Sequence, residues 1–124
     1  MKTNKLTGVA LDWAVAKCEG AVDFRFDTVA TYWVTLGGKD RALRSGWAQS
    51  YLPSTDWAQG GPIIERERLE LASTDDTLDD DKWMSWSQDG YHVMYGTNLL
   101  IAAMRCYVVS KLGYDVDIPS ELLK

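Results

Sequence analysis

The segment from Asn98 to Leu112 constrains the fold of this chain most, because wound as a helix it is apolar on nearly every side. Thr97 precedes it as an N-cap, and Gly113 follows it as a helix stop. A helix of this length spans about 22 Å. Since such a helix has no face suited to water, it predicts that the rest of the chain packs around it.

A second helix is predicted near the N-terminal end, from about Gly8 to Glu19. Thr7 stands in the N-cap position, and Gly20 stands where a helix stop belongs. We expect this helix and the C-terminal helix to pack against the same small sheet. Within the span from Gly8 to Glu19, apolar side chains recur at helical spacing, at Leu11, Ala14, Val15 and Cys18.

The segment that follows the first helix has the pattern of an antiparallel strand pair. Residues Val22–Asp27 alternate between apolar and charged, which predicts a half-buried strand with Phe24 and Phe26 facing inward. Residues Thr31–Leu36 are rich in β-branched and aromatic side chains and predict the second strand. The mixed, basic segment Lys39–Gln49 is expected to be a loop or a short helical segment.

Further strands are expected in the second half of the chain. Leu69–Leu71 alternates, and Trp83–Trp86 is short and aromatic. The turn signal Asp89-Gly90 predicts that Tyr91–Tyr95 pairs back as a hairpin. Tyr114–Ile118 alternates before a proline and is expected to add an edge strand.

These elements together predict a single α+β domain over residues 1–124, with a small, mainly antiparallel sheet packed against the N-terminal helix and the buried C-terminal helix. Cys18 and Cys106 are far apart and lie within apolar helical patterns. We interpret both as buried thiols of a reducing compartment, in preference to a disulfide. We expect neither a signal peptide nor a transmembrane segment, and therefore a cytoplasmic protein.

The least generic run of the sequence is the loop around Pro53. Pro53 disfavours helix in the residue before it, and Ser54 can then cap a short turn. Gly60-Gly61 is expected to end that turn, and Pro62 to restart the chain as a first helical residue or as a strand. Helix and strand stay equally open for Ile63–Glu67. A rigid, polar loop of this kind is often a binding site or a structural keystone.

Three blocks of the sequence carry a family resemblance. They are Leu6–Gly8 with Ala10–Lys17, then Ser54–Glu67, and then Leu100–Val108 followed by Ser110-Lys111. Together they resemble the NinX-like family of small phage proteins, whereas residues 21–50 and 72–95 resemble it little. The resemblance implies a phage accessory protein made inside a bacterial host cell, and it implies no particular activity.

Arg105 is the most suggestive single residue, because a guanidinium within an almost wholly apolar helix needs a partner. One interpretation pairs it with Asp56, Glu65 or Glu67, so that it fastens the proline loop to the helix. The other interpretation leaves it available for a phosphate or carboxylate of a ligand. The sequence favours the internal pair, since such arginines are commonly satisfied within the fold.

Catalytic groups are scarce in this sequence. His92 is the only histidine and lies in a strand-like run, and no nucleophile elbow accompanies it. The sequence has no Cys/His cluster for a metal and no phosphate-binding glycine loop, and the consecutive carboxylates Asp79–Asp81 do not form a preorganised cation site. We therefore predict no catalytic residue, metal or cofactor. The third hypothesis for the function is a small hydrolase. Its catalytic groups would be either Asp56 with Glu65, or His92.

The predicted function is a non-enzymatic module that binds a nucleotide-like metabolite or signal, in a pocket formed by the proline loop and the last helix. The alternative is a module that binds or inhibits a host protein through a surface that is acidic around Asp79–Asp81 and rich in tryptophan. Nucleic acid is not expected as a partner, because the net charge is −5 and the sequence has no basic patch. A membrane is not expected either, because no apolar run reaches transmembrane length. The sequence does not decide whether the protein forms a homodimer. The predicted ligand contacts are Ser54, Thr55, Asp56, Trp57, Gln59, Arg66 and Arg105.

Overall fold

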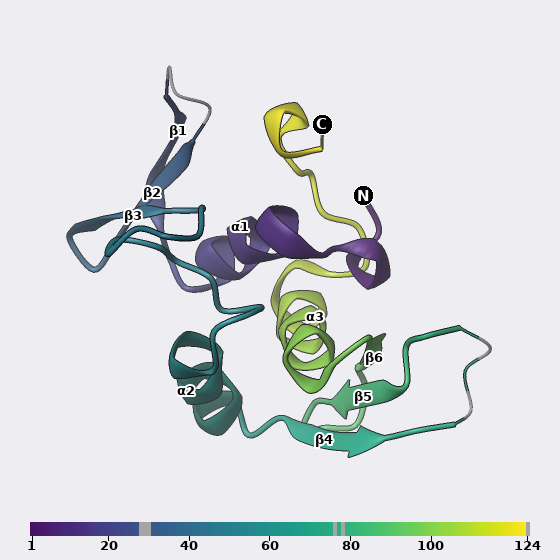
Figure 1. Cartoon of the computed structure of the whole chain (residues 1–124). Helices are drawn as coiled ribbons and strands as arrows, with labels where there is room; N and C mark the ends of the chain where they lie inside the picture. The colour runs from purple at the N-terminus through teal and green to yellow at the C-terminus, as the bar shows by residue number, and fades with distance from the viewer. Residues whose placement is uncertain (28–30, 76, 78, 124) are drawn as a thin grey trace.

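The computed structural model describes residues 1–27, 31–75, 77 and 79–123 of the chain. Figure 1 shows the C-terminal helix α3 at the centre, between the helix α1 and a small sheet. The α+β class is confirmed, with the strands divided between two antiparallel three-stranded sheets, β1-β2-β3 and β4-β5-β6. The elements are η1 (Thr3–Lys5), α1 (Gly8–Cys18), β1 (Val22–Phe26), β2 (Tyr32–Leu36), β3 (Lys39–Ala42), α2 (Trp57–Glu67), β4 (Glu70–Ser73), β5 (Trp83–Trp86), β6 (Val93–Gly96), α3 (Leu99–Leu112) and η2 (Ser120–Leu122).

Helix α3 is the buried centre that its composition predicts. Its residues from 102 to 109 are all buried. Asn98 caps the helix, because its side-chain oxygen accepts a hydrogen bond of 2.9 Å from the backbone N–H of Ile101. The cap expected at Thr97 therefore lies one residue later. Gly113 ends the helix with a positive φ of 86°, as predicted.

Small side chains bring α3 close to the sheet β4-β5-β6. Gly96 packs so tightly that a Cβ there would lie 2.6 Å from the backbone nitrogen of Ala102. Ser85 is fully buried on the same face, next to the buried Met94. The expected hairpin of β5 and β6 is confirmed, and β4 pairs with the other edge of β5.

Helix α1 matches its predicted span to within one residue. It starts after Thr7, which has extended backbone angles but makes no side-chain capping bond. The helix buries every residue from Ala10 to Ala16, including Asp12, and it packs against α3. Both cysteines are free thiols. Within the described ranges no helix is long and apolar enough to cross a membrane.

The prediction that Phe26 faces inward is wrong. The β1–β2 register shifts between Val22 and Arg25, where Asp23 has a φ of 57°. This bulge breaks the alternation of inward and outward side chains. Phe24 still packs on Trp13, with ring centroids 5.4 Å apart, but Phe26 is 45% exposed.

Strand β3 replaces the loop or helical segment expected to begin at Lys39. Gly37 and Gly38 both have positive φ, of 60° and 77°, and form the tight turn of a two-residue hairpin. Lys39 therefore lies opposite Leu36, and the strand continues to Ala42. The glycine pair predicted the end of β2, but the charged composition of β3 hid its strand character.

Helix α2 runs through the residues that were expected to stop it. The proposed stop at Gly60-Gly61 is wrong, and so is the proposed restart at Pro62. Gly60 is needed for packing, because a Cβ there would lie 2.4 Å from the carbonyl oxygen of Pro53. The open choice for Ile63–Glu67 is settled as helix, which ends at Arg68 with a left-handed φ of 55°.

The edge strand expected at Tyr114–Ile118 is reduced to an isolated bridge between Lys2 and Asp115. The backbone N–H of Val116 donates to the carbonyl of Met1 at 2.9 Å. The segment after α3 therefore holds the N-terminal residues in place without extending either sheet.

Candidate functional site

The polar groups of the proline loop mostly bind one another or α1. Ser54 is fully buried, and its backbone N–H donates to the Asp12 carboxylate at 2.8 Å. The Ser54 hydroxyl has no hydrogen-bond partner among the described residues. Burial raises the pKa of Asp12 to about 7, although the Ser54 N–H opposes this shift. Ser54 thus anchors the loop to α1 and does not face solvent.

Gln59 and Asp56 hold the entry of α2. The Gln59 side-chain oxygen accepts from the Leu52 N–H at 2.7 Å, and its nitrogen donates to the Ser50 carbonyl and to Asp56, both at 3.1 Å. Asp56 also caps the helix by accepting from the Ala58 N–H at 3.0 Å. The helix cap expected at Ser54 therefore lies at Asp56.

Two of the predicted contacts, Thr55 and Trp57, do face solvent. Thr55 is exposed, and Trp57 is 51% exposed at the first turn of α2. Their part in ligand binding stays a prediction. Neither residue lines the pocket beside Glu67 and Lys111.

Arg105 is satisfied inside the fold, but not by the partners expected from the sequence. Its Nε donates to the Leu6 carbonyl at 2.8 Å, and its Nη1 donates to the Tyr95 carbonyl at 2.7 Å. The Asp81 carboxylate lies 3.7 Å from Nη1. Burial lowers the pKa of Arg105, and Asp81 opposes this effect. Arg105 therefore joins the N-terminal segment, β6 and the acidic segment, and its predicted contact with a ligand stays untested.

The sequence offered Asp56, Glu65 or Glu67 as the internal partner of Arg105, and this expectation is wrong. Arg105 points toward β6 and the N-terminal segment, whereas Asp56 begins α2 and Glu67 ends it. Glu67 instead binds Arg66 and Lys111.

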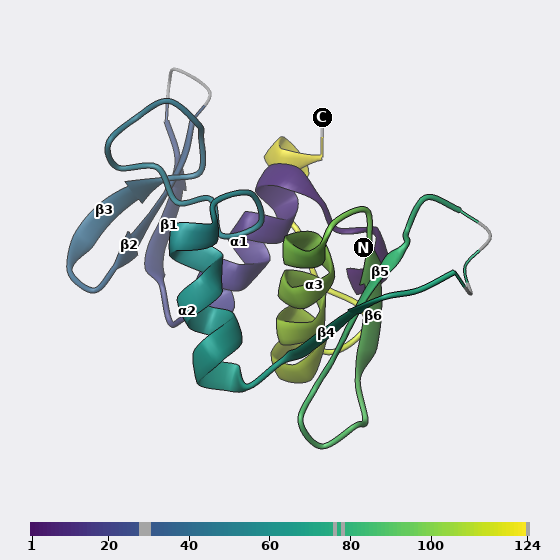
Figure 2. The ribbon, with the colours of Figure 1, turned by 60° about the horizontal axis from the view of Figure 1, so that its bottom comes forward.

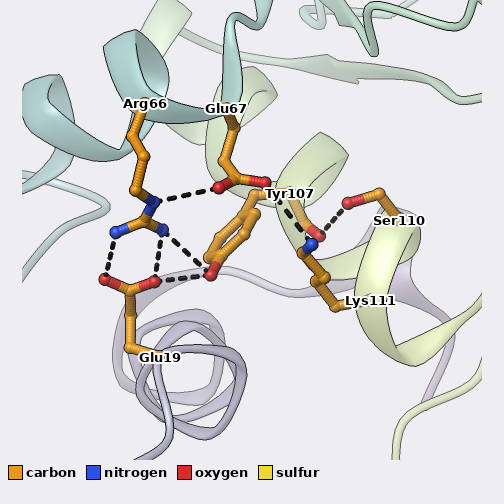
Figure 3. Close-up of polar contacts among 6 residues, drawn as sticks. All are labelled: Glu19, Arg66, Glu67, Tyr107, Ser110 and Lys111. Atoms are coloured by element: carbon orange, nitrogen blue, oxygen red, sulfur yellow. Dashed lines mark hydrogen bonds and ion pairs between the residues drawn. The ribbon is translucent and has the colours of Figure 1, made fainter.

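Arg66 lies in a polar network that joins α2, α3 and the end of α1 (Figure 3). Its guanidinium donates to both carboxylate oxygens of Glu19, which follows α1, and to Glu67 at 2.9 Å. It also donates at 3.1 Å to the hydroxyl of Tyr107 on α3, which in turn donates to Glu19. Lys111 completes the network with an ion pair of 3.5 Å to Glu67.

Replacing Glu19 by Gln should lower the free energy of unfolding by about 1–2 kcal/mol at neutral pH. Burial opposes the ionisation of Glu19, but hydrogen bonds from Arg66 and Tyr107 outweigh it and lower its pKa. Its stabilising contribution is therefore present above the pKa of an unfolded glutamate and is lost as the pH falls through the lower folded value. Urea unfolding at pH 7 measures the loss of stability in Glu19→Gln. Urea unfolding at pH 3 measures how much of this loss disappears when the pH falls. Glu65→Gln, at an exposed position next to Arg66 on α2, is the control, and an equal loss there would contradict the network.

Next to this network lies a pocket of about 460 Å³. It is bounded by the end of α2, the turn between β5 and β6, and the last turn of α3. Most of its lining side chains can form hydrogen bonds. They are Glu67, Leu69, Ser87, Gln88, Asp89, His92, Ser110 and Lys111.

The turn on one side of the pocket is fixed by its own hydrogen bonds. The Ser87 hydroxyl donates to Asp89 at 2.5 Å and accepts from the His92 backbone N–H at 3.2 Å. The Tyr91 N–H adds a bond of 3.0 Å to the same Asp89 oxygen. The bond from Ser87 is the main cause of the lowered pKa of Asp89, so this carboxylate stays ionised at neutral pH.

Ser87, Asp89 and His92 meet in the pocket, but they do not form a catalytic triad. A triad needs the serine hydroxyl to donate to the imidazole, whereas the Ser87 hydroxyl donates to Asp89. Ser87 is also buried, at 7% exposure. The imidazole Nδ1 of His92 is buried without a hydrogen-bond partner in the described part of the chain. This geometry suits binding better than nucleophilic chemistry.

The acidic segment before β5 is held by hydrogen bonds among its own residues. Lys82 donates to the Thr77 carbonyl at 2.6 Å, and the Thr77 hydroxyl donates to the Asp81 carbonyl at 2.9 Å. Asp79 and Asp80 are exposed, and Asp76 lies outside the described residues. Over the described ranges, no group of three or more acidic, histidine or cysteine side chains is arranged to hold a metal ion.

Sequence reasoning missed this pocket, although it singled out several of its residues for other reasons. Asp89 was interpreted only as part of a turn, and Glu67 only as a partner of Arg105 and as the end of a block that carries the family resemblance. Lys111 and Ser110 were noted only within the family resemblance. The one available signal was that polar residues fall at the ends of two helices and in a hairpin turn.

Comparison with known proteins supports the resemblance noted in the sequence. No curated protein matches the chain. A family model described as "Bacteriophage P22, NinX" matches residues 2–111, which is nearly the whole sequence. The chain therefore belongs to the phage NinX family.

Proposed function

We propose that this protein is a non-enzymatic phage accessory protein that binds a small polar ligand of nucleoside size in the pocket beside Glu67 and Lys111. The observation that carries the proposal is the pocket itself. Its volume of about 460 Å³ falls within the range of about 300–1,000 Å³ typical of small-molecule sites. The polar network of Figure 3 holds one wall of it rigid.

The charges around the pocket favour a ligand with hydroxyl and amino groups over a polyphosphate. Glu67 and Asp89 can accept hydrogen bonds from a ribose or an amine. Lys111 is the pocket's ammonium group, and Glu67 already pairs with it at 3.5 Å. Among the described lining residues, a triphosphate would therefore meet two carboxylates and a single cation, which already pairs with Glu67. The half-buried imidazole ring of His92 lines the pocket and can stack on a heterocyclic base.

Filling the pocket should abolish binding without unfolding the protein. Ser110 is exposed on α3 and lines the pocket, so Ser110→Phe places a ring inside it. We expect the affinity for the bound nucleoside to fall at least about tenfold, or about 1.4 kcal/mol. Isothermal titration against nucleosides, mononucleotides and dinucleotides measures the effect.

Ser45→Phe, an exposed position in the loop after β3, is the control that should bind normally. If no member of the panel binds the unmodified protein, the proposal is wrong. If Trp57→Ala abolishes binding while Ser110→Phe does not, the ligand lies at the proline loop, as the sequence predicted.

A further inference from the structure

The sheet β4-β5-β6 carries apolar side chains on the face that an antiparallel sheet normally turns to water. One face of such a sheet usually packs on the core, and the other is polar. Here α3 lies against one face, and the opposite face is turned away from the three helices (Figures 1 and 2). The register places two rows of three residues on this outer sheet face: Glu70, Trp86 and Val93 in one row, and Ala72, Met84 and Tyr95 in the other.

Packing of the core does not explain why apolar side chains lie on the outer sheet face. Ser85 is fully buried on the face toward α3, whereas Val93 is 39% and Tyr95 is 36% exposed on the outer sheet face. Tyr91, two residues before Val93, is 81% exposed. Polar and apolar side chains are thus partly exchanged between the two faces. Contiguous apolar side chains at the surface of a domain usually mark a binding surface.

Carboxylates lie on the outer sheet face and in the segment that precedes β5. Glu70 is exposed and lies in its first row, where it accepts a hydrogen bond from the indole of Trp86. Asp79 and Asp80 are exposed in the segment before β5, and Asp79 lines a small cleft together with Tyr95 of the outer sheet face. A surface with an apolar centre and an acidic rim complements one with an apolar centre and a basic rim.

We propose that the outer sheet face binds a partner protein whose contact surface has an apolar centre flanked by lysine or arginine. The acidic rim argues against the other occupants of such a face. A second copy of this chain would bring the same carboxylates against each other, and an anionic membrane or a nucleic acid would be repelled by them. The observation is independent of the pocket.

Two fluorescent peptides with the same central sequence Val-Tyr-Leu-Val test this proposal. One is flanked on each side by two lysines and the other by two glutamates. Fluorescence anisotropy should show at least tenfold tighter binding of the lysine peptide, and this preference should shrink as salt is added. Val93→Lys, at an exposed position, should abolish the binding. Val22→Lys, at 59% exposure on β1, is the matched control and should leave it intact.

Other outcomes overturn the proposal. These are no binding of the lysine peptide, equal binding of both peptides, or binding that survives Val93→Lys. Sedimentation that shows a dimer disrupted by Val93→Lys would assign the face to a second copy, and binding to phosphatidylglycerol vesicles would assign it to a membrane. The pocket variant Ser110→Phe should bind the lysine peptide normally, so this proposal and the ligand proposal fail separately.

Discussion

The change in the free energy of unfolding caused by Asp12→Asn should be about 2–3 kcal/mol more stabilising at pH 8 than at pH 5. Asp12 is 2% exposed, and burial raises its pKa to about 7. Between the pKa of an unfolded aspartate and pH 7, the folded state keeps a proton that the unfolded state loses. The stability of the unmodified protein therefore falls as the pH rises through this window and stays low above it. Asn cannot ionise, and its oxygen can still accept the Ser54 N–H.

Urea unfolding of both proteins at the two pH values measures this difference. Asp117→Asn, at an exposed position near the C-terminal end, controls for the change of net charge. The same stability change at pH 5 and pH 8 would show that Asp12 is ionised in the folded state throughout this range.

Arg105→Met should lower the free energy of unfolding by about 3–5 kcal/mol. It removes a buried charge that donates to two backbone carbonyls and pairs with Asp81. For a domain of this size the melting temperature should fall by more than about 10 °C. A second substitution, Asp56→Asn, should not restore stability, since Asp56 is not a partner of this arginine. Arg105→Lys should recover only part of the loss, because one ammonium group cannot reproduce the spread of the guanidinium.

Thermal unfolding followed by circular dichroism measures all three proteins. A melting temperature that does not change in Arg105→Met would mean that the guanidinium is not needed for folding. It would then favour the contact with a ligand that the sequence suggested.

The elements predicted correctly from the sequence are those whose signal is local. The span from Asn98 to Leu112 is apolar all round, and this alone places α3 in the centre of the domain. The Asp89-Gly90 turn likewise fixes the β5–β6 hairpin.

The elements predicted wrongly depend on contacts between distant residues. In the sequence, Gly60 has the position of a helix stop. In the structure it lies inside α2, where the carbonyl of Pro53 packs so closely that there is no room for a side chain. Three of the four residues of strand β3 are charged, and the segment is a strand because Gly37-Gly38 folds it back on β2. No spacing in the sequence shows either of these requirements.

The candidate pocket could not be predicted for the same reason. Glu67, Asp89 and Lys111 come from three elements that the fold brings together, and each looks like an ordinary surface residue in the sequence. The proline loop attracted the site prediction because its residues are unusual, yet Ser54 and Gln59 are unusual for structural reasons. A rigid loop has the same sequence signature whether it binds a ligand or supports a fold.

The most direct test of the ligand pocket is to map amide chemical shifts by NMR while the best-binding nucleoside is added to the intact protein. The pocket predicts that the largest changes fall on residues 87–92 and 108–112 and on the end of α2 near Glu67. Changes confined to residues 52–59 around Trp57, or no saturable change with any nucleoside, would contradict it.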